Sequence, residues 1–187
     1  FGLDPAAVAV QPMTIDLDRF RPDRPYRPMR SVFGLPEDAV VIGIVTRFQK
    51  YRRMDTFVEA AARVVAQRPN VRFLVLGWSG QTEETVVKPV RQHGMEQHVI
   101  LGGYRTDDYD DTLACMDIFS LLMPGYDGTA RAVREAMALG LPCVVSDIGM
   151  LPEPNVSAVL LKNPEARIAL DLNSEWKQLT GNDLVQG

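Results

Sequence analysis

The sequence predicts an α/β protein built on a Rossmann-like parallel sheet with helices on both faces. Short runs rich in β-branched residues alternate with longer segments whose apolar residues recur at helical spacing, from residue 40 to residue 179. Runs of the first kind are typical of strands buried on both faces. Strict alternation, with helical crossovers of about a dozen residues, indicates that the strands lie parallel.

The first strand and the helix after it carry the clearest signal. Val40 to Val45 is a continuous apolar run, as a strand covered on both faces requires. Met54 to Arg68 follows, with apolar residues such as Phe57, Ala61 and Val64 on one helical face. The basic stretch between the two segments is therefore predicted to be a loop at the end of a strand.

The later elements repeat this order. Gly77 closes the second strand, and Gly140 ends a helix, a position where glycine is favoured. The remaining strands are predicted at residues 71–76, 98–101, 118–122, 143–145 and 158–161, and the remaining helices at residues 83–93, 108–116, 130–139 and 164–179.

The chain of 187 residues has the length of one domain with a leading connector. Five of its 13 prolines precede Pro36, and proline fixes φ and lacks an N–H donor. Residues 1–38 are therefore predicted to be an extended interdomain connector with little regular structure, and residues 39–187 the ligand-binding domain. The chain opens at Phe1 without Met, which we interpret as the start of an excised domain.

Composition excludes several classes of function. A formal net charge of −4 argues against nucleic acid as a partner. No apolar run approaches the ~20 residues of a membrane-spanning helix, and the N-terminus does not resemble a signal peptide. Cys115 and Cys143 are expected to be buried and reduced, which favours a cytoplasmic location. His93 and His98 have no neighbours at metal-ligand spacing.

Ligands of such sheets bind at the carboxyl ends of the strands. The search for a site is thereby confined to four loops, at residues 46–53, 77–82, 102–107 and 123–130. The first loop carries four cations in seven residues, Arg47, Lys50, Arg52 and Arg53. The planar fork of arginine suits phosphate oxygens, so this loop predicts an anion site. The alternative is an ordinary solvated basic turn.

The last of these loops leads into a helix that could also face an anion. Gly128 lets the backbone approach a ligand closely, and Thr129 is a candidate N-cap. A helix that begins here offers N–H groups and about half a positive charge. Glu135, about two turns into it, either accepts hydrogen bonds from paired sugar hydroxyls or is an ordinary exposed glutamate. Asp127 either caps the helix or faces a substrate hydroxyl.

At these residues the sequence resembles the group 1 family of retaining glycosyltransferases, which have the two-domain GT-B architecture. Residues 10–22 are similar to the family pattern V-I-P-N-G-V-D-x-x-x-F-x-P, and residues 43–60 to G-x-x-G-R-x-x-x-x-K-G-x-x-x-x-x-E-A. Residues 127–142 resemble E-x7-E-A-M-A-x-G-x-P, and residues 145–153 resemble V-x-S-D-x-G-x-x-P-E. The last three blocks occur in order and at matching distances, which makes the resemblance specific.

The resemblance implies that this chain is the C-terminal half of a GT-B architecture and binds a nucleoside-diphosphate sugar. The full-length protein would be a glycosyltransferase of the hexosyltransferase type, acting with retention on an acceptor sugar or lipid-linked sugar. The N-terminal acceptor domain is absent, so the isolated domain is expected to be inactive. No metal or other cofactor is expected, and any membrane association would come from the missing part.

The resemblance also implies roles for single residues. Arg47 and Arg52 would hold the donor diphosphate, with Lys50 as a substitute for, or helper to, Arg52. Asp127 would lie near the donor sugar, and Glu135 would bind the ribose hydroxyls. The contacts to the sugar, phosphate and nucleobase would come from Gly128, Thr129, Ala130, Gly103 and Tyr104.

Departures from the family pattern leave other functions open. Asp127 is one methylene shorter than the usual glutamate, and Arg52 replaces lysine. A non-catalytic sugar-nucleotide-binding module and a sugar-nucleotide epimerase of the same architecture are the alternatives. A receiver-like signalling domain would need clustered acidic residues at the strand ends, where this chain has Arg47 and Gly77.

Overall fold

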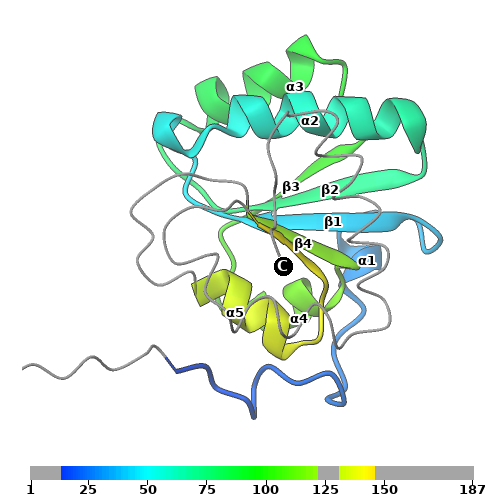
Figure 1. Ribbon diagram of the computed structural model, residues 1–187, viewed down its shortest axis with the longest axis vertical. Helices are drawn as coiled ribbons and strands as arrows, with labels where there is room; N and C mark the ends of the chain where they lie inside the picture. The colour runs from blue at the N-terminus through cyan, green and yellow to red at the C-terminus, as the bar shows by residue number, and fades with distance from the viewer. Residues whose placement is uncertain (1–13, 122–130, 146–187) are drawn as a thin grey trace, which may run out of the picture.

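The computed structural model describes residues 14–121 and 131–145, and these residues form a five-stranded parallel sheet with helices on both faces (Figure 1). The predicted fold class is therefore confirmed. The strands are β1 (Val40–Val45), β2 (Val71–Leu76), β3 (Val99–Gly103), β4 (Ile118–Leu121) and β5 (Cys143–Val145). The helices are α1 (Met29–Val32), α2 (Met54–Gln67), α3 (Lys88–Gln92), α4 (Tyr109–Ala114) and α5 (Arg131–Ala138).

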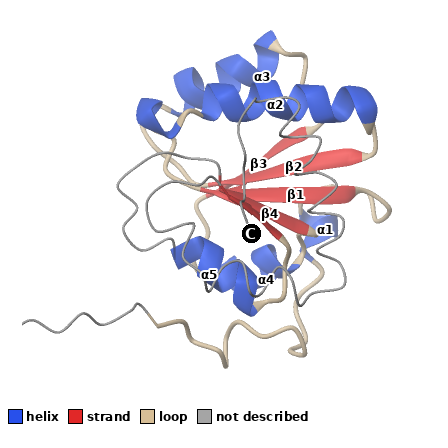
Figure 2. Ribbon diagram, in the orientation of Figure 1, coloured by secondary structure: helices blue, strands red, loops and turns tan. Residues whose placement is uncertain are grey.

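The strand order is β3-β2-β1-β4-β5, which places β1 at the centre. The chain winds from β1 outward through β2 to β3, and then crosses to the other side of β1 to form β4 and β5. Helices α2 and α3 cover one face of the sheet, and α4 and α5 cover the other (Figure 2). The winding reverses between β1 and β4, and in sheets of this kind a ligand crevice opens at that point, beyond the carboxyl ends of the strands.

The core forms where β-branched and aromatic side chains of the central strands meet the helices. Val41 and Ile44 of β1 are fully buried, as is Phe73 of β2. The ring of Phe73 packs edge-on against Phe57 of α2, with 5.7 Å between ring centroids. The register pairs Val40 with Val71 and runs unbroken to Val45 opposite Leu76, so the carboxyl ends of the two central strands finish together.

The elements agree with the predicted ones, with small differences at their ends. The segment predicted as one helix over residues 83–93 begins with a π-helical turn, η3 (Glu83–Val87), before α3. Such turns occur often at functional sites. Gly140 has φ +78, which explains why the helix before it ends there. The predicted strand at 158–161 and helix at 164–179 lie outside the described residues.

Residues 14–38, named the arm below, pack along the face of the sheet that carries α4. The arm contains only the short α1 and turns, in line with its predicted lack of regular structure. Four arginines tie it down, with Arg19 and Arg24 bonded to Asp110, Arg27 to Asp111, and Arg30 to Asp117, at 2.5–2.8 Å. The arm is thus joined to the rest of the described chain by a network of ion pairs.

No helix in the described ranges is long and apolar enough to cross a lipid bilayer.

Candidate functional site

The candidate site lies where the central strands end. The loop after β1 contains the 3-10 turn η2 (Lys50–Arg52) and leads into α2. The loop after β2 leads into η3, and the loop after β3 leads into α4. Helix α5 follows the carboxyl end of β4, and its first residues lie at this same edge (Figure 1). Four chain segments that are distant in sequence are thereby brought to one edge of the sheet.

The loop after β1 presents its cations in two different environments. Arg47 is exposed, and Lys50 pairs with Glu84 of η3 at 3.0 Å. Arg52 is only 7% exposed, and two of its guanidinium nitrogens, Nε and Nη1, are fully buried. Its Cζ lies 5.2 Å from the ring centroid of Tyr51. Both predicted phosphate ligands, Arg47 and Arg52, therefore stand on the loop that leaves the central strand.

The loop after β2 braces this basic loop. The hydroxyls of Ser79 and Thr85 both donate to the carbonyl oxygen of Phe48, the Thr85 bond measuring 3.2 Å. The side-chain oxygen of Gln81 accepts a hydrogen bond of 3.3 Å from the backbone N–H of Lys50. These bonds add to the anchoring of the loop by Phe48, whose side chain is buried in the core. No pattern in the sequence pointed to the roles of Ser79 and Thr85.

Gly77 allows the two loops to come together. Its φ is +138, a conformation that L side chains rarely adopt. A Cβ built on Gly77 would lie 1.8 Å from the carbonyl oxygen of Thr46. The backbone N–H of Gly77 donates to the carbonyl of Gly103 at 2.9 Å, which joins the third loop to the other two.

Glu135 is the most deeply buried acidic side chain at this edge, at 2% exposure. Its Oε2 accepts a hydrogen bond from the hydroxyl of Tyr109 at 2.7 Å, and its Oε1 accepts one from Nε of Arg131 at 2.7 Å. Burial, together with the negative charge of Glu135, raises the pKa of Tyr109 far above its ordinary value of 10.0, so the phenol stays protonated. Glu135 is thus not an ordinary exposed glutamate.

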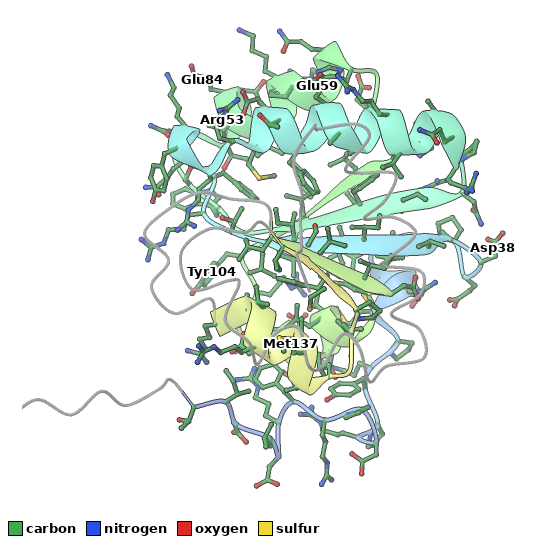
Figure 3. All side chains as sticks on the ribbon, in the orientation of Figure 1. Asp38, Arg53, Glu59, Glu84, Tyr104 and Met137 are labelled. Carbon is green, nitrogen blue, oxygen red and sulfur yellow. The ribbon has the colours of Figure 1, made fainter. Side chains whose placement is uncertain are left out.

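Of the other predicted site residues, the structure describes Gly103 and Tyr104 only. Gly103 has φ +70 and precedes Tyr104, whose side chain is 76% exposed. Tyr104 lies on the same side of the molecule as the start of α5 (Figure 3). The predicted contacts at Asp127, Gly128, Thr129 and Ala130 lie outside the described residues.

The two cysteines offer no reactive thiol at neutral pH. Cys143 is buried, as predicted, and Cys115 is half-buried. Burial raises the pKa of Cys143 to about 12 and that of Cys115 to about 11. Within residues 14–121 and 131–145, no three His, Cys, Asp or Glu side chains gather as metal ligands would.

The amino-acid sequence of the chain matches a known protein family. A sequence model of the family described as glycosyl transferases group 1 matches residues 26–173. The chain belongs to this family. The resemblance seen in the sequence motifs is thereby confirmed, and the motif blocks of residues 43–60 and 127–142 fall within the matched range.

Known glycosyltransferases are about a quarter to a third identical to this group 1 chain over the residues that align. D-inositol 3-phosphate glycosyltransferase of Streptomyces bingchenggensis is 30% identical over 162 residues, covering 81% of this chain and 35% of that protein. An Escherichia coli enzyme, UDP-Gal:alpha-D-GlcNAc-diphosphoundecaprenol alpha-1,3-galactosyltransferase, is 26% identical and is covered over 43% of its length. The chain therefore spans less than half the length of these relatives.

Solved structures confirm the fold of this group 1 domain. The C-terminal domain of the group 1 protein LpcC from Francisella tularensis superposes with a TM-score of 0.64 at 18% identity, covering 88% of this chain and 91% of that one. HepE from Anabaena in complex with UDP gives a TM-score of 0.65 at 17% identity, covering 88% of this chain and 51% of that one. The fold is the Rossmann-like one of GT-B glycosyltransferase domains.

Proposed function

We propose that the chain binds a nucleoside-diphosphate sugar at the carboxyl edge of its sheet, and that the whole protein transfers the sugar to an acceptor hydroxyl with retained configuration. The observation that carries the proposal is the basic loop of residues 46–53, which leaves the central strand β1 beside the switch to β4. Membership of the group 1 family supports the reaction class. UDP is the first nucleotide to test, because the solved HepE complexes hold UDP and UDP-glucose.

Charge development in the reaction explains why cations are needed at this place. Breaking the bond between the sugar and the phosphate leaves an oxocarbenium-like sugar and an additional negative charge on the diphosphate. Arg47 and Arg52 would stabilise that charge, and preorganised donors of this kind contribute about 3 kcal/mol each. We propose that these two side chains supply the charge that a metal ion would otherwise provide.

The remaining roles follow from the same pose of the donor. The departing phosphate would take the proton of the acceptor hydroxyl on the face from which it leaves, which accounts for retention. Glu135 would accept hydrogen bonds from the ribose hydroxyls, and Asp127 would lie near the donor sugar. The nucleobase would lie against Gly103 and Tyr104, with backbone groups of residues 128–130 near the sugar and phosphate.

Nucleotide titration of the Arg47→Ala variant by calorimetry tests the phosphate site. We expect the affinity for UDP to fall ~10- to 100-fold, because one charge-assisted hydrogen bond is worth about 1.5–3 kcal/mol. The affinity for uridine, which has no phosphate, should change little. Arg63→Ala is the matched control, since Arg63 is an exposed arginine of α2 that pairs with Glu59. Equal losses for UDP and uridine would remove Arg47 from the phosphate site.

A further inference from the structure

We infer that Tyr109 is a positioning residue that fixes the carboxylate of Glu135 for the ribose of the donor, and that Arg131 is the partner that the ribose hydroxyls displace. The inference rests on the proposed function. It assigns different tasks to the two side chains that bond to Glu135, at 2.7 Å in each case.

The two partners differ in how firmly each is held. The side chain of Arg131 is 65% exposed, so water can solvate its guanidinium when it leaves, whereas the Glu135 carboxylate is only 2% exposed and needs the ribose hydroxyls to take the vacated place. Tyr109 is half-buried at the start of α4, and its ring packs edge-on against Phe20 of the arm, with 6.2 Å between centroids. One partner of Glu135 is therefore exchangeable, and the other is built into the fold.

The arm fixes both the backbone of α4 at Tyr109 and the Tyr109 ring. The next residue along α4, Asp110, is bonded to Arg19 at 2.8 Å and to Arg24 at 2.6 Å, and both arginines belong to the arm. Phe20 follows Arg19 directly, so the same stretch of the arm fixes both the helix and the ring. A hydroxyl on a ring held in this way needs little ordering when a ligand arrives.

The number of hydrogen bonds that the Glu135 carboxylate can accept is consistent with one fixed and one exchangeable partner. An ionised carboxylate offers about four lone-pair positions, and Glu135 uses two of them for Tyr109 and Arg131. A vicinal diol needs two acceptor positions at a fixed angle. The bond from Tyr109 fixes the plane of the carboxylate, and departure of Arg131 opens Oε1 toward the edge where α5 begins. The hydroxyl of Tyr109 is a donor throughout the neutral pH range, because even the ordinary tyrosine pKa of 10.0 leaves it protonated and burial beside Glu135 raises the pKa further.

A double-mutant cycle tests the inference on the intact 187-residue chain. The readout is ribose preference, the ratio of the affinity for UDP to the affinity for 2′-deoxy-UDP, measured by calorimetry. We expect Glu135→Gln and Tyr109→Phe each to lower this ratio at least fivefold. Tyr109→Phe should have no further effect on the ratio when Glu135→Gln is already present, because Tyr109 acts through Glu135.

Three further variants sharpen the test. Tyr26→Phe is the matched control, since it also removes a tyrosine hydroxyl, but one that donates to the backbone carbonyls of Arg19 and Arg21 instead of Glu135, and should leave the ratio unchanged. Replacement of Tyr109 by p-aminophenylalanine restores a donor and should restore the ratio. Arg131→Met should raise the affinity for UDP several-fold, because the ribose no longer has to displace a partner of Glu135.

The outcomes separate this inference from the proposed function. A ratio that falls in Glu135→Gln but not in Tyr109→Phe overturns the role of Tyr109 and leaves the ribose site intact. A loss of UDP affinity in Arg131→Met overturns the exchange. Absence of nucleotide binding by the unmodified chain overturns both the proposed function and the inference. If Tyr109→Phe does not fold, p-methylphenylalanine at position 109 removes the donor at nearly constant volume and replaces it in the cycle.

Discussion

At the scale of single residues, the candidate site depends on Gly77 as much as on its charged side chains. The loop that carries Arg47 and Arg52 can lie against the loop after β2 only because Gly77 has no side chain. The carbonyl of Thr46 occupies the position that a Cβ of Gly77 would take. A small residue with an unusual backbone conformation therefore sets the geometry of the basic loop.

Gly77→Ala should destabilise the protein by about 1–3 kcal/mol, because alanine cannot adopt φ +138 without strain and would contact the Thr46 carbonyl. Urea denaturation measures the change in the free energy of unfolding. Gly80→Ala, in the same loop, is the control, because a Cβ added at Gly80 would meet no heavy atom within 4 Å. An equal effect of the two substitutions would contradict this account of Gly77.

The sequence predicted which residues matter at this edge but not how each is held. Arg47 and Arg52 were assigned alike, yet one is exposed and the other is 7% exposed. The burial of Glu135 could not be predicted, because its partner Tyr109 stands 26 residues away and belongs to another helix. An aromatic residue at the start of a helix carries no local signal of such a bond.

At the scale of elements, the arm and α4 form one unit. Asp110 and Asp111 open α4 with side chains that are 6% and 7% exposed, and both accept bonds from arginines of the arm. Burial alone would raise the pKa of Asp110, but hydrogen bonds from Arg19 and Arg24 hold it below its ordinary value of 3.8. The folded protein therefore favours the charged form of Asp110.

Asp110→Asn should lower the free energy of unfolding at neutral pH by about 1–3 kcal/mol. The substitution replaces the carboxylate that pairs with Arg19 and Arg24 by a neutral amide. A carboxyl whose pKa is lowered by folding contributes stability above its unfolded pKa, and this contribution is lost as the pH falls. The difference from the unmodified chain should thus shrink below about pH 4. Denaturation curves across pH 3–7 measure it.

The control for this prediction is Glu59→Gln on α2. Glu59 forms an exposed pair with Arg63, both side chains being about half exposed, and such pairs contribute little. Its effect should stay within about 0.5 kcal/mol at every pH. A deficit in Asp110→Asn that persists unchanged at pH 3 would show that the ion pairs are not its source.

The contacts of the arm with the rest of the chain could not be predicted from the sequence. Its prolines correctly predicted little regular structure, since only α1 forms within residues 14–38. Its arginines, however, meet aspartates some 80 to 90 residues further along the chain. Pairings of that range leave no periodicity in the sequence, so the ion-pair network could not be predicted.

At the scale of the whole molecule, the alternation of strands and helices determined most of the fold. Continuous apolar runs such as Val40–Val45 and Val71–Leu76 are needed by strands covered on both faces, and the bounds predicted for both agree with the structure. The alternation of strands and helices does not determine the strand order β3-β2-β1-β4-β5, because several strand orders are compatible with it. The order nevertheless places the predicted loops at one edge, as any parallel sheet must.

Every role proposed above requires that a nucleotide sugar binds at this edge, and amide chemical-shift mapping can locate the bound ligand. UDP-, GDP- and ADP-sugars are first screened for a rise in melting temperature, and the most stabilising one is titrated into the labelled chain. We predict that the largest shifts fall on residues 46–53, 77–82 and 102–107. Shifts confined to the opposite edge, or no binding of any of the three nucleotide sugars at saturating concentration, would contradict the proposal.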